Sequence, residues 1–109
     1  MTVEQLIKAA DLKAIALPSP DREIGGAYIG DLLSWVMGRA SEDDAWITIM
    51  SNANIIAVAT LADVSCIILA EGVAPDSGVA ETAETKGVNL LCSEKSAYEI
   101  AKLLSNIGL

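Results

Sequence analysis

The chain has 109 residues, a size at which a folded domain buries roughly two-thirds of the surface that its unfolded chain exposes. Apolar residues make up 52% of it and charged residues 20%, so the composition is not that of a disordered chain. Aromatic residues are few and phenylalanine is absent, which favours an aliphatic core in an α/β fold over a β-sandwich. We expect residues 1–109 to form a single domain.

The net charge is −8, and the seven basic residues are scattered along the chain. A protein without a basic stripe releases few counterions from a nucleic acid and is repelled by an anionic membrane. The sequence therefore predicts neither a nucleic-acid partner nor a membrane partner. No apolar run approaches the roughly 18 residues that span a bilayer, and the first residues lack a secretory signal, so we expect a cytoplasmic protein.

Histidine is absent, and the only cysteines are Cys66 and Cys92, each inside an apolar run. Zinc sites need more nitrogen and sulfur ligands than this, so the sequence predicts no metal site, no cofactor and two buried, reduced thiols. General acid–base chemistry near neutral pH draws on histidine or on carboxylates shifted by burial, and the carboxylates here lie in turns and on helix surfaces. We therefore expect no enzymatic activity.

The first forty residues predict two helices separated by an irregular segment. Thr2 and Gln5 form a capping box for a short helix, and residues 13–17 follow as an apolar strand that ends at a proline-containing turn. Residues 22–30 contain three glycines and predict a loop or an irregular edge strand. A helix then begins at Asp31, whose charge complements the helix dipole. Its predicted apolar face consists of Leu32, Leu33, Val36, Met37 and Ala40.

From residue 45 onward the pattern alternates between strands and helices. Residues 45–50, 65–70 and 88–92 predict buried strands, the last of them short. Residues 51–64 have the β-branched content of a strand, but Asn52 or Asn54 can cap a helix and the apolar spacing favours one. Residues 77–86 predict a helix that stops at Gly87, and Ser96 with Glu99 form a second capping box for the last helix.

Alternating strands and helices are typical of parallel βα units, so the expected fold is a three-layer α/β sandwich with a mainly parallel sheet. The strand at residues 13–17 and the glycine segment can add one or two strands at an edge, one of them antiparallel. The sequence leaves their order open.

Several spaced blocks resemble the DRTGG domain family over about residues 13–108. They are DREIGG (21–26), YIGDLLSWVM (28–37), DAWITI (44–49), NIIAVATLAD (54–63), CIILAEG (66–72) and SAYEIAKLL (96–104). The first block has Glu23 and Ile24 where the family's motif has one threonine, so no role of that threonine carries over.

The resemblance implies a fold like the N-terminal domains of MurF and HPr kinase. It also implies a regulatory role, because DRTGG domains accompany CBS domains in regulated pyrophosphatases and also occur alone. It does not imply kinase activity, since the sequence lacks a phosphate-binding loop that ends in Gly-Lys-Ser/Thr. The family supplies no established catalytic residues to carry over.

The DREIGG segment is the first candidate ligand site. Arg22 can pair with an anion, Gly25 and Gly26 can bring backbone N–H groups close to it, and Asp21 belongs to the same motif. The alternative is an ordinary tight turn in which Arg22 pairs with Asp21 or Glu23.

The second candidate lies where the parallel strands end, because ligands of open parallel sheets bind beyond the carboxyl ends of their strands. Asn52 and Asn54 are the leading residues there, and the others are Ser51, Glu71, Gly72, Ser93 and Glu94. Each can instead serve as a helix cap or turn residue.

Tyr28 and Trp35 are candidate interface residues, since Trp35 falls off the main apolar face of its helix and aromatic residues are enriched in interface cores. The leading hypothesis is a regulatory module that senses an adenine nucleotide or another small anionic metabolite, acting through a homodimer or a partner protein. The alternatives are a structural adaptor without a ligand and an enzyme whose site is completed by a partner.

Overall fold

The computed structural model describes residues 1–109 and contains one five-stranded sheet with the order β1-β5-β4-β3-β2. The strands are β1 (Lys13–Ala16), β2 (Gly26–Ile29), β3 (Asp44–Thr48), β4 (Cys66–Leu69) and β5 (Leu90–Cys92). The four strands β2, β3, β4 and β5 run parallel to one another, and β1 pairs antiparallel with β5. The mainly parallel sheet is therefore confirmed, and its two N-terminal strands occupy opposite edges.

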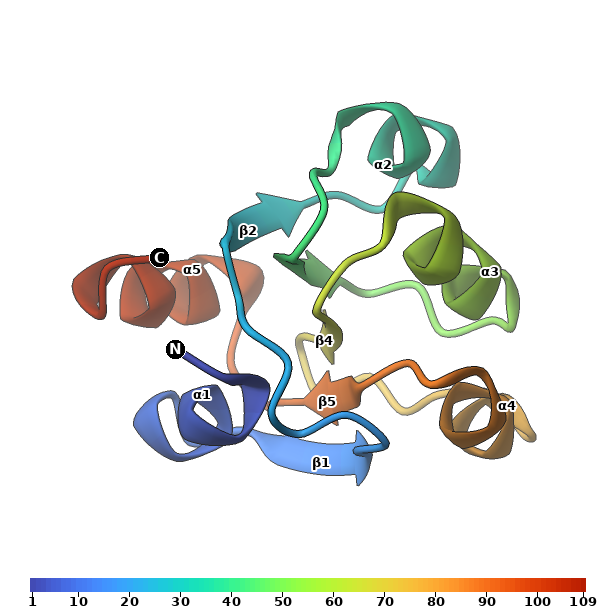
Figure 1. The fold of residues 1–109 in the computed structure, drawn as a ribbon, viewed down its shortest axis with the longest axis horizontal. Helices are drawn as coiled ribbons and strands as arrows, with labels where there is room; N and C mark the ends of the chain where they lie inside the picture. The colour runs from blue at the N-terminus through green and yellow to red at the C-terminus, as the bar shows by residue number, and fades with distance from the viewer.

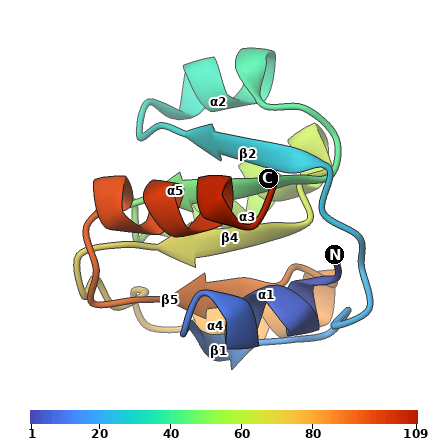
Figure 2. The ribbon, with the colours of Figure 1, turned by 90° about the vertical axis from the view of Figure 1, so that its left-hand side faces the viewer.

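Five helices complete the three layers, which Figures 1 and 2 show from two directions. They are α1 (Val3–Ala9), α2 (Leu33–Arg39), α3 (Asn54–Ala62), α4 (Val79–Lys86) and α5 (Ala97–Asn106). α1 and α5 cover one face of the sheet, and α2, α3 and α4 cover the other (Figure 1). No helix has the length and apolar character needed to cross a membrane.

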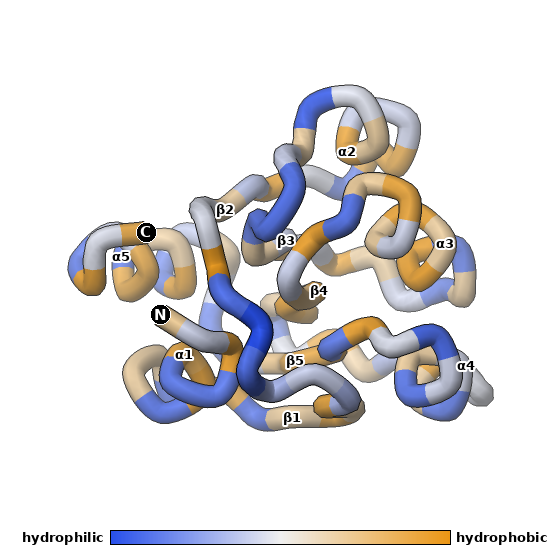
Figure 3. Tube along the Cα trace, in the orientation of Figure 1, coloured by the Kyte–Doolittle hydropathy of each residue, from blue (hydrophilic) through white to orange (hydrophobic).

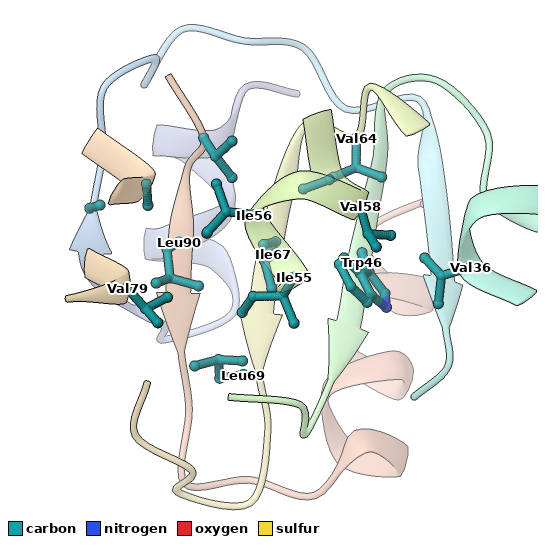
Figure 4. Packing of buried hydrophobic residues seen from close by; sticks show 14 residues of the cluster. Val36, Trp46, Ile55, Ile56, Val58, Val64, Ile67, Leu69, Val79 and Leu90 are labelled. Atoms are coloured by element: carbon teal, nitrogen blue, oxygen red, sulfur yellow. The ribbon is translucent and has the colours of Figure 1, made fainter. Parts of the chain in front are cut away.

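The core is split by the sheet into two layers, because successive strand side chains point to opposite faces. Trp46, Ile67 and Leu90 point toward α2, α3 and α4, where they meet Ile55 and Val58 (Figure 4). On the opposite face, Ile47, Ile68 and Leu91 pack against α1 and α5 through residues that include Leu6, Ile100 and Leu104. Burial on both faces explains why β4 and residues 45–47 of β3 are continuous apolar runs in the sequence.

The predicted capping boxes are confirmed at both ends of the chain. The Gln5 N–H donates to Thr2 Oγ1 at 3.2 Å, and the Glu99 N–H donates to Ser96 Oγ at the same distance. In each box the side chain three residues on accepts from the backbone N–H of the capping residue. These local hydrogen bonds fix where α1 and α5 begin.

α2 differs from its prediction in start and in packing. It begins at Leu33, and Asp31 serves β3 instead, because its Oδ1 accepts from the Thr48 hydroxyl at 2.8 Å and from the Ile49 N–H at 2.9 Å. The predicted inward face is wrong at Leu32 and Met37, which are exposed, whereas Val36 is fully buried. The reason is that α2 lies over the edge of the sheet and covers only a narrow stripe.

α3 is confirmed as a helix, and Asn52 caps it as one of the two predicted candidates. Ala53 already has helical dihedral angles, φ −61° and ψ −21°, and Asn52 Oδ1 accepts from the Asn54 N–H at 2.9 Å, the hydrogen bond that an N-cap side chain makes. Ile55, Val58 and Ala59 are buried as predicted.

The connection from β1 to β2 is strongly hydrophilic at its centre (Figure 3), and it crosses the amino ends of the parallel strands. Asn89, 2% exposed, holds it to the sheet. The Asn89 amide donates to the carbonyls of Ser19 and Ser65, and its Oδ1 accepts from the Ser19 N–H at 2.9 Å. The sequence assigned Asn89 to a strand and gave no sign of this role.

Candidate functional site

Arg22, the predicted anion-binding residue, lies at the amino edge of the sheet and contacts two carboxylates. Its Nη2 donates to Asp43 Oδ1 at 2.9 Å and to Asp63 Oδ1 at 3.0 Å, and also to the Asp63 carbonyl at 2.7 Å. Asp43 precedes β3 and Asp63 ends α3, so one guanidinium joins three segments of the chain. These hydrogen bonds and charges raise the pKa of Arg22 against the opposing effect of desolvation.

The neighbouring residues of the DREIGG segment also make contacts within the chain. The Gly25 N–H donates to the Asp43 carbonyl at 2.9 Å, and Glu23 pairs with the amino terminus at 3.1 Å. Ile24 is buried in the core layer beneath α1 and α5, and Asp21 is exposed. The alternative prediction, in which Arg22 pairs with Asp21 or Glu23, is therefore wrong. Arg22 Nε and Nη2 and the Gly25 amide already donate within the chain, so a ligand that used these donors would have to displace those bonds, and ligand binding here remains a prediction.

Asn52 and Asn54 lie at the opposite, carboxyl edge, in the turn that follows β3. Beside them Ser51 donates its hydroxyl to Asp76 Oδ1 at 2.9 Å, which joins the turn to the segment before α4. Since the parallel strands separate Arg22 from these asparagines, the two predicted sites cannot contribute to one ligand. The structure therefore leaves two separate candidates.

A cavity of about 480 Å³ opens at the carboxyl edge, between the start of β1 and the loops that follow β4 and β5. Lys13, Ile15 and Cys92 line it from the sheet. The remaining lining residues come from the loops and are Asp11, Gly72, Val73, Ala74, Pro75, Ser93, Glu94 and Lys95. Its size falls within the range of small-molecule sites.

Backbone hydrogen bonds hold the two loops of this cavity against each other. The Glu71 N–H donates to the Lys95 carbonyl at 2.8 Å, and the Gly72 N–H donates to the Ser93 carbonyl at 3.0 Å. Glu71 and Gly72 both have positive φ, 62° and 72°, and for Glu71 this left-handed conformation is unfavourable. A Cβ on Gly72 would come within 2.4 Å of Glu94 Oε2, the end of a flexible side chain that can move aside, so it is the φ of 72° that favours glycine here.

Cys92 differs from the prediction of two buried thiols, because it is only half-buried and lines the cavity. Burial raises the pKa of its thiol, and the charge of Lys13 opposes that rise. Cys66 is buried as predicted, and burial raises the pKa of its thiol to about 12. Both thiols therefore stay protonated near neutral pH.

The cavity was only partly visible in the sequence. Gly72, Ser93 and Glu94 were expected at strand ends, but Lys13 and Cys92 were not linked to them. Lys13 reaches this edge because β1 runs antiparallel to β5, which places Lys13 directly opposite Cys92. The sequence could not link Lys13 to Cys92 because it did not show that β1 pairs with β5.

The predicted interface residues differ in exposure. Trp35 is 53% exposed, as expected, and the Arg39 guanidinium stacks 3.9 Å from its ring centroid. Tyr28 is partly buried and packs against the core layer beneath α2, α3 and α4. Of the two, Trp35 is the side chain that a partner can reach.

Comparisons with known proteins agree with this architecture. The sequence matches the DRTGG domain family over residues 19–107, so the chain belongs to that family. The fold is similar to a crystal structure of the CBS and DRTGG domains of the regulatory region of a Clostridium perfringens pyrophosphatase complexed with its activator, diadenosine tetraphosphate. The TM-score is 0.70 at 17% sequence identity, and the match covers 94% of this chain and 45% of the other. No curated protein sequence matches.

Proposed function

We propose that this chain is a non-catalytic regulatory module that binds a small anionic metabolite, such as an adenine nucleotide, and transmits the binding through a homodimer or a partner protein in the cytoplasm. The observation that carries the proposal is the preformed cavity at the carboxyl edge of a DRTGG-family sheet, with lysines and apolar residues in its wall. This is the edge at which ligands of open parallel sheets bind.

Two further observations support the proposal. The similar pyrophosphatase region is regulatory and was crystallised with a nucleotide activator, although this chain spans less than half of that structure. In this chain the thiol of Cys66 is buried and the carboxylates of Asp43 and Asp63 pair with Arg22, so these groups serve the fold rather than chemistry.

The test is a titration of the purified protein against AMP, ADP, ATP and diadenosine tetraphosphate, followed by thermal unfolding and calorimetry. A ligand present at about one hundred times its dissociation constant adds about 2.7 kcal/mol to the free energy of unfolding, which moves the melting temperature of a domain this small by about ten degrees. If none of the four compounds produces a shift or heat of binding, the adenine-nucleotide proposal fails. The adaptor without a ligand would then be the better description.

A further inference from the structure

The cavity at the carboxyl edge combines groups from three separate parts of the chain. Lys13 and Cys92 are directly opposite in the antiparallel pair of β1 and β5, so both side chains lie on the same face of the sheet. Ile15, two residues along β1, packs against the same core layer as Cys92 and lines the cavity together with the loop Val73–Pro75. Lys95 lines the same cavity from the loop before α5.

Lys13 and Lys95 are the cations of this cavity, and neither makes a close salt bridge with a carboxylate. Lys13 has no carboxylate within 4.0 Å, and Lys95 Nζ lies 3.8 Å from an oxygen of Asp11, whose side chain is 95% exposed. An exposed pair at this distance contributes little free energy and exchanges easily for another anion. By contrast, Arg22 donates to three acceptors at 3.0 Å or less. Of the two candidate sites, the cavity therefore has the more available positive charge and the DREIGG segment the less.

The remaining wall of the cavity limits which anion fits. Asp11 and Glu94 also line it, so its two positive charges are matched by two negative ones. A chain of several phosphates would meet these carboxylates, whereas one phosphate can lie at the lysines. Ile15, Val73 and Pro75 provide an apolar surface that suits the flat body of a ligand.

We infer that this cavity is the ligand site, and that it takes a small monophosphorylated compound of nucleotide size, with the phosphate at Lys13 and Lys95 and the ring against Ile15, Val73 and Pro75. The inference rests on the proposed function and adds to it the location of the site and the number of phosphates. It also replaces Arg22 as the residue expected to meet the anion.

Cys92 supplies a reporter inside the site, since it is the only thiol that reagents can reach in the folded protein. We would measure the alkylation rate of Cys92 by iodoacetamide, using mass spectrometry, with AMP, ATP, adenosine or inorganic phosphate added. AMP should slow alkylation at least fivefold at saturation. Adenosine and phosphate should each bind more weakly than AMP, and ATP should bind no more tightly.

Lysine variants test the site independently of the thiol. Lys13→Ala and Lys95→Ala should each raise the dissociation constant of AMP by about tenfold, as expected for the loss of a hydrogen bond to a charged group. Lys102→Ala, which removes an exposed lysine of α5, is the matched control and should bind AMP like the parent. Thermal unfolding without ligand confirms that each variant is folded.

The outcomes separate this inference from the proposed function. If AMP binds but leaves Cys92 alkylation unchanged, and both lysine variants bind it like the parent, the inference is overturned while nucleotide sensing stands. If ATP or diadenosine tetraphosphate binds much more tightly than AMP, the single-phosphate assignment is overturned. If no nucleotide binds, both proposals fail together.

Discussion

Arg22 shows how one side chain of a named motif can serve the fold. It reaches the carboxylates of Asp43 and Asp63, which lie 21 and 41 residues away in the sequence, and its Nη2 also donates to the Asp63 carbonyl. Asp43 and Asp63 both have positive φ, at 69° and 56°, so the guanidinium stabilises two strained turns at once. We therefore assign Arg22 a structural role at the amino edge of the sheet.

The Arg22→Ala variant tests that role. It should lower the free energy of unfolding by about 1 to 2 kcal/mol, the low end for hydrogen bonds to charged groups, because Asp43 and Asp63 are partly exposed. Urea unfolding gives the value, and Lys102→Ala, within about 0.5 kcal/mol of the parent, is the control. A variant as stable as the parent would restore Arg22 as a candidate ligand-binding residue.

Because burial raises the pKa of the Cys66 thiol, we expect the folded protein to lose stability at alkaline pH. Its pKa is about 12 in the folded protein against an ordinary value of 9.0, so between these pH values the unfolded chain releases a proton that the folded chain keeps. Stability from this group is complete below pH 9 and falls above it, by at most about 1.4 kcal/mol per pH unit.

The measurement compares the parent with Cys66→Ala in urea under reducing conditions from pH 7.5 to 10.5, conditions that we choose to bracket the ordinary thiol pKa. The stability advantage of the parent should shrink as the pH rises above about 9. Cys92 is present in both proteins and its contribution cancels. Two curves that stay parallel across this range would contradict the assignment.

At the scale of elements, the loop between β4 and α4 depends on Gly72. The residue combines a φ of 72° with a close approach to Glu94, and its N–H donates to the Ser93 carbonyl. The loop after β5 is thereby held in place, and both loops form the wall of the cavity. Local backbone conformation and the shape of the site are coupled through this one position.

The Gly72→Ala variant should lower the free energy of unfolding by about 1 to 2 kcal/mol through the left-handed conformation. The carboxylate of Glu94 can rotate away from the added methyl group, so the loss should be nearly the same in a Glu94→Ala background, which a double-mutant cycle measures by urea unfolding. Gly38→Ala is the control. Gly38 lies inside α2 with nothing within 4 Å of an added Cβ, so this change should stabilise the helix by about 0.5 to 1 kcal/mol.

At the scale of the whole molecule, several exposed apolar residues lie together around the edge strand β2, α2 and the end of β3. Ile29 on the edge strand β2, Leu32 and Trp35 at α2, and Ile49 after β3 are all between 47% and 60% exposed. β2 pairs only with β3 and leaves its other edge unpaired. An unpaired edge beside apolar side chains favours association with a second copy, which is the basis for the proposed homodimer.

The fluorescence of Trp35 can be used to test the proposed homodimer. Trp46 is fully buried, so acrylamide should quench mainly Trp35 in a dilute solution. At about 100 μM, where a dimer of about −5.5 kcal/mol is half formed, the quenching of Trp35 should decrease and the mass from light scattering should rise. Trp35→Ala should remain monomeric at the same concentration. A parent protein that scatters as a monomer and keeps its full quenching would refute the dimer.

The sequence by itself determined the local elements and the family, and the tertiary structure decided the sites. Capping boxes, helical spacing and continuous apolar strands are local signals, and they correctly predicted α1, α3, α5 and that β3, β4 and β5 run parallel. The partners of Arg22, the role of Asn89 and the pairing of Lys13 with Cys92 join residues that are distant in the chain. Such contacts depend on which edge each N-terminal strand joins, and strand order is set by packing across the whole sheet rather than by any local pattern.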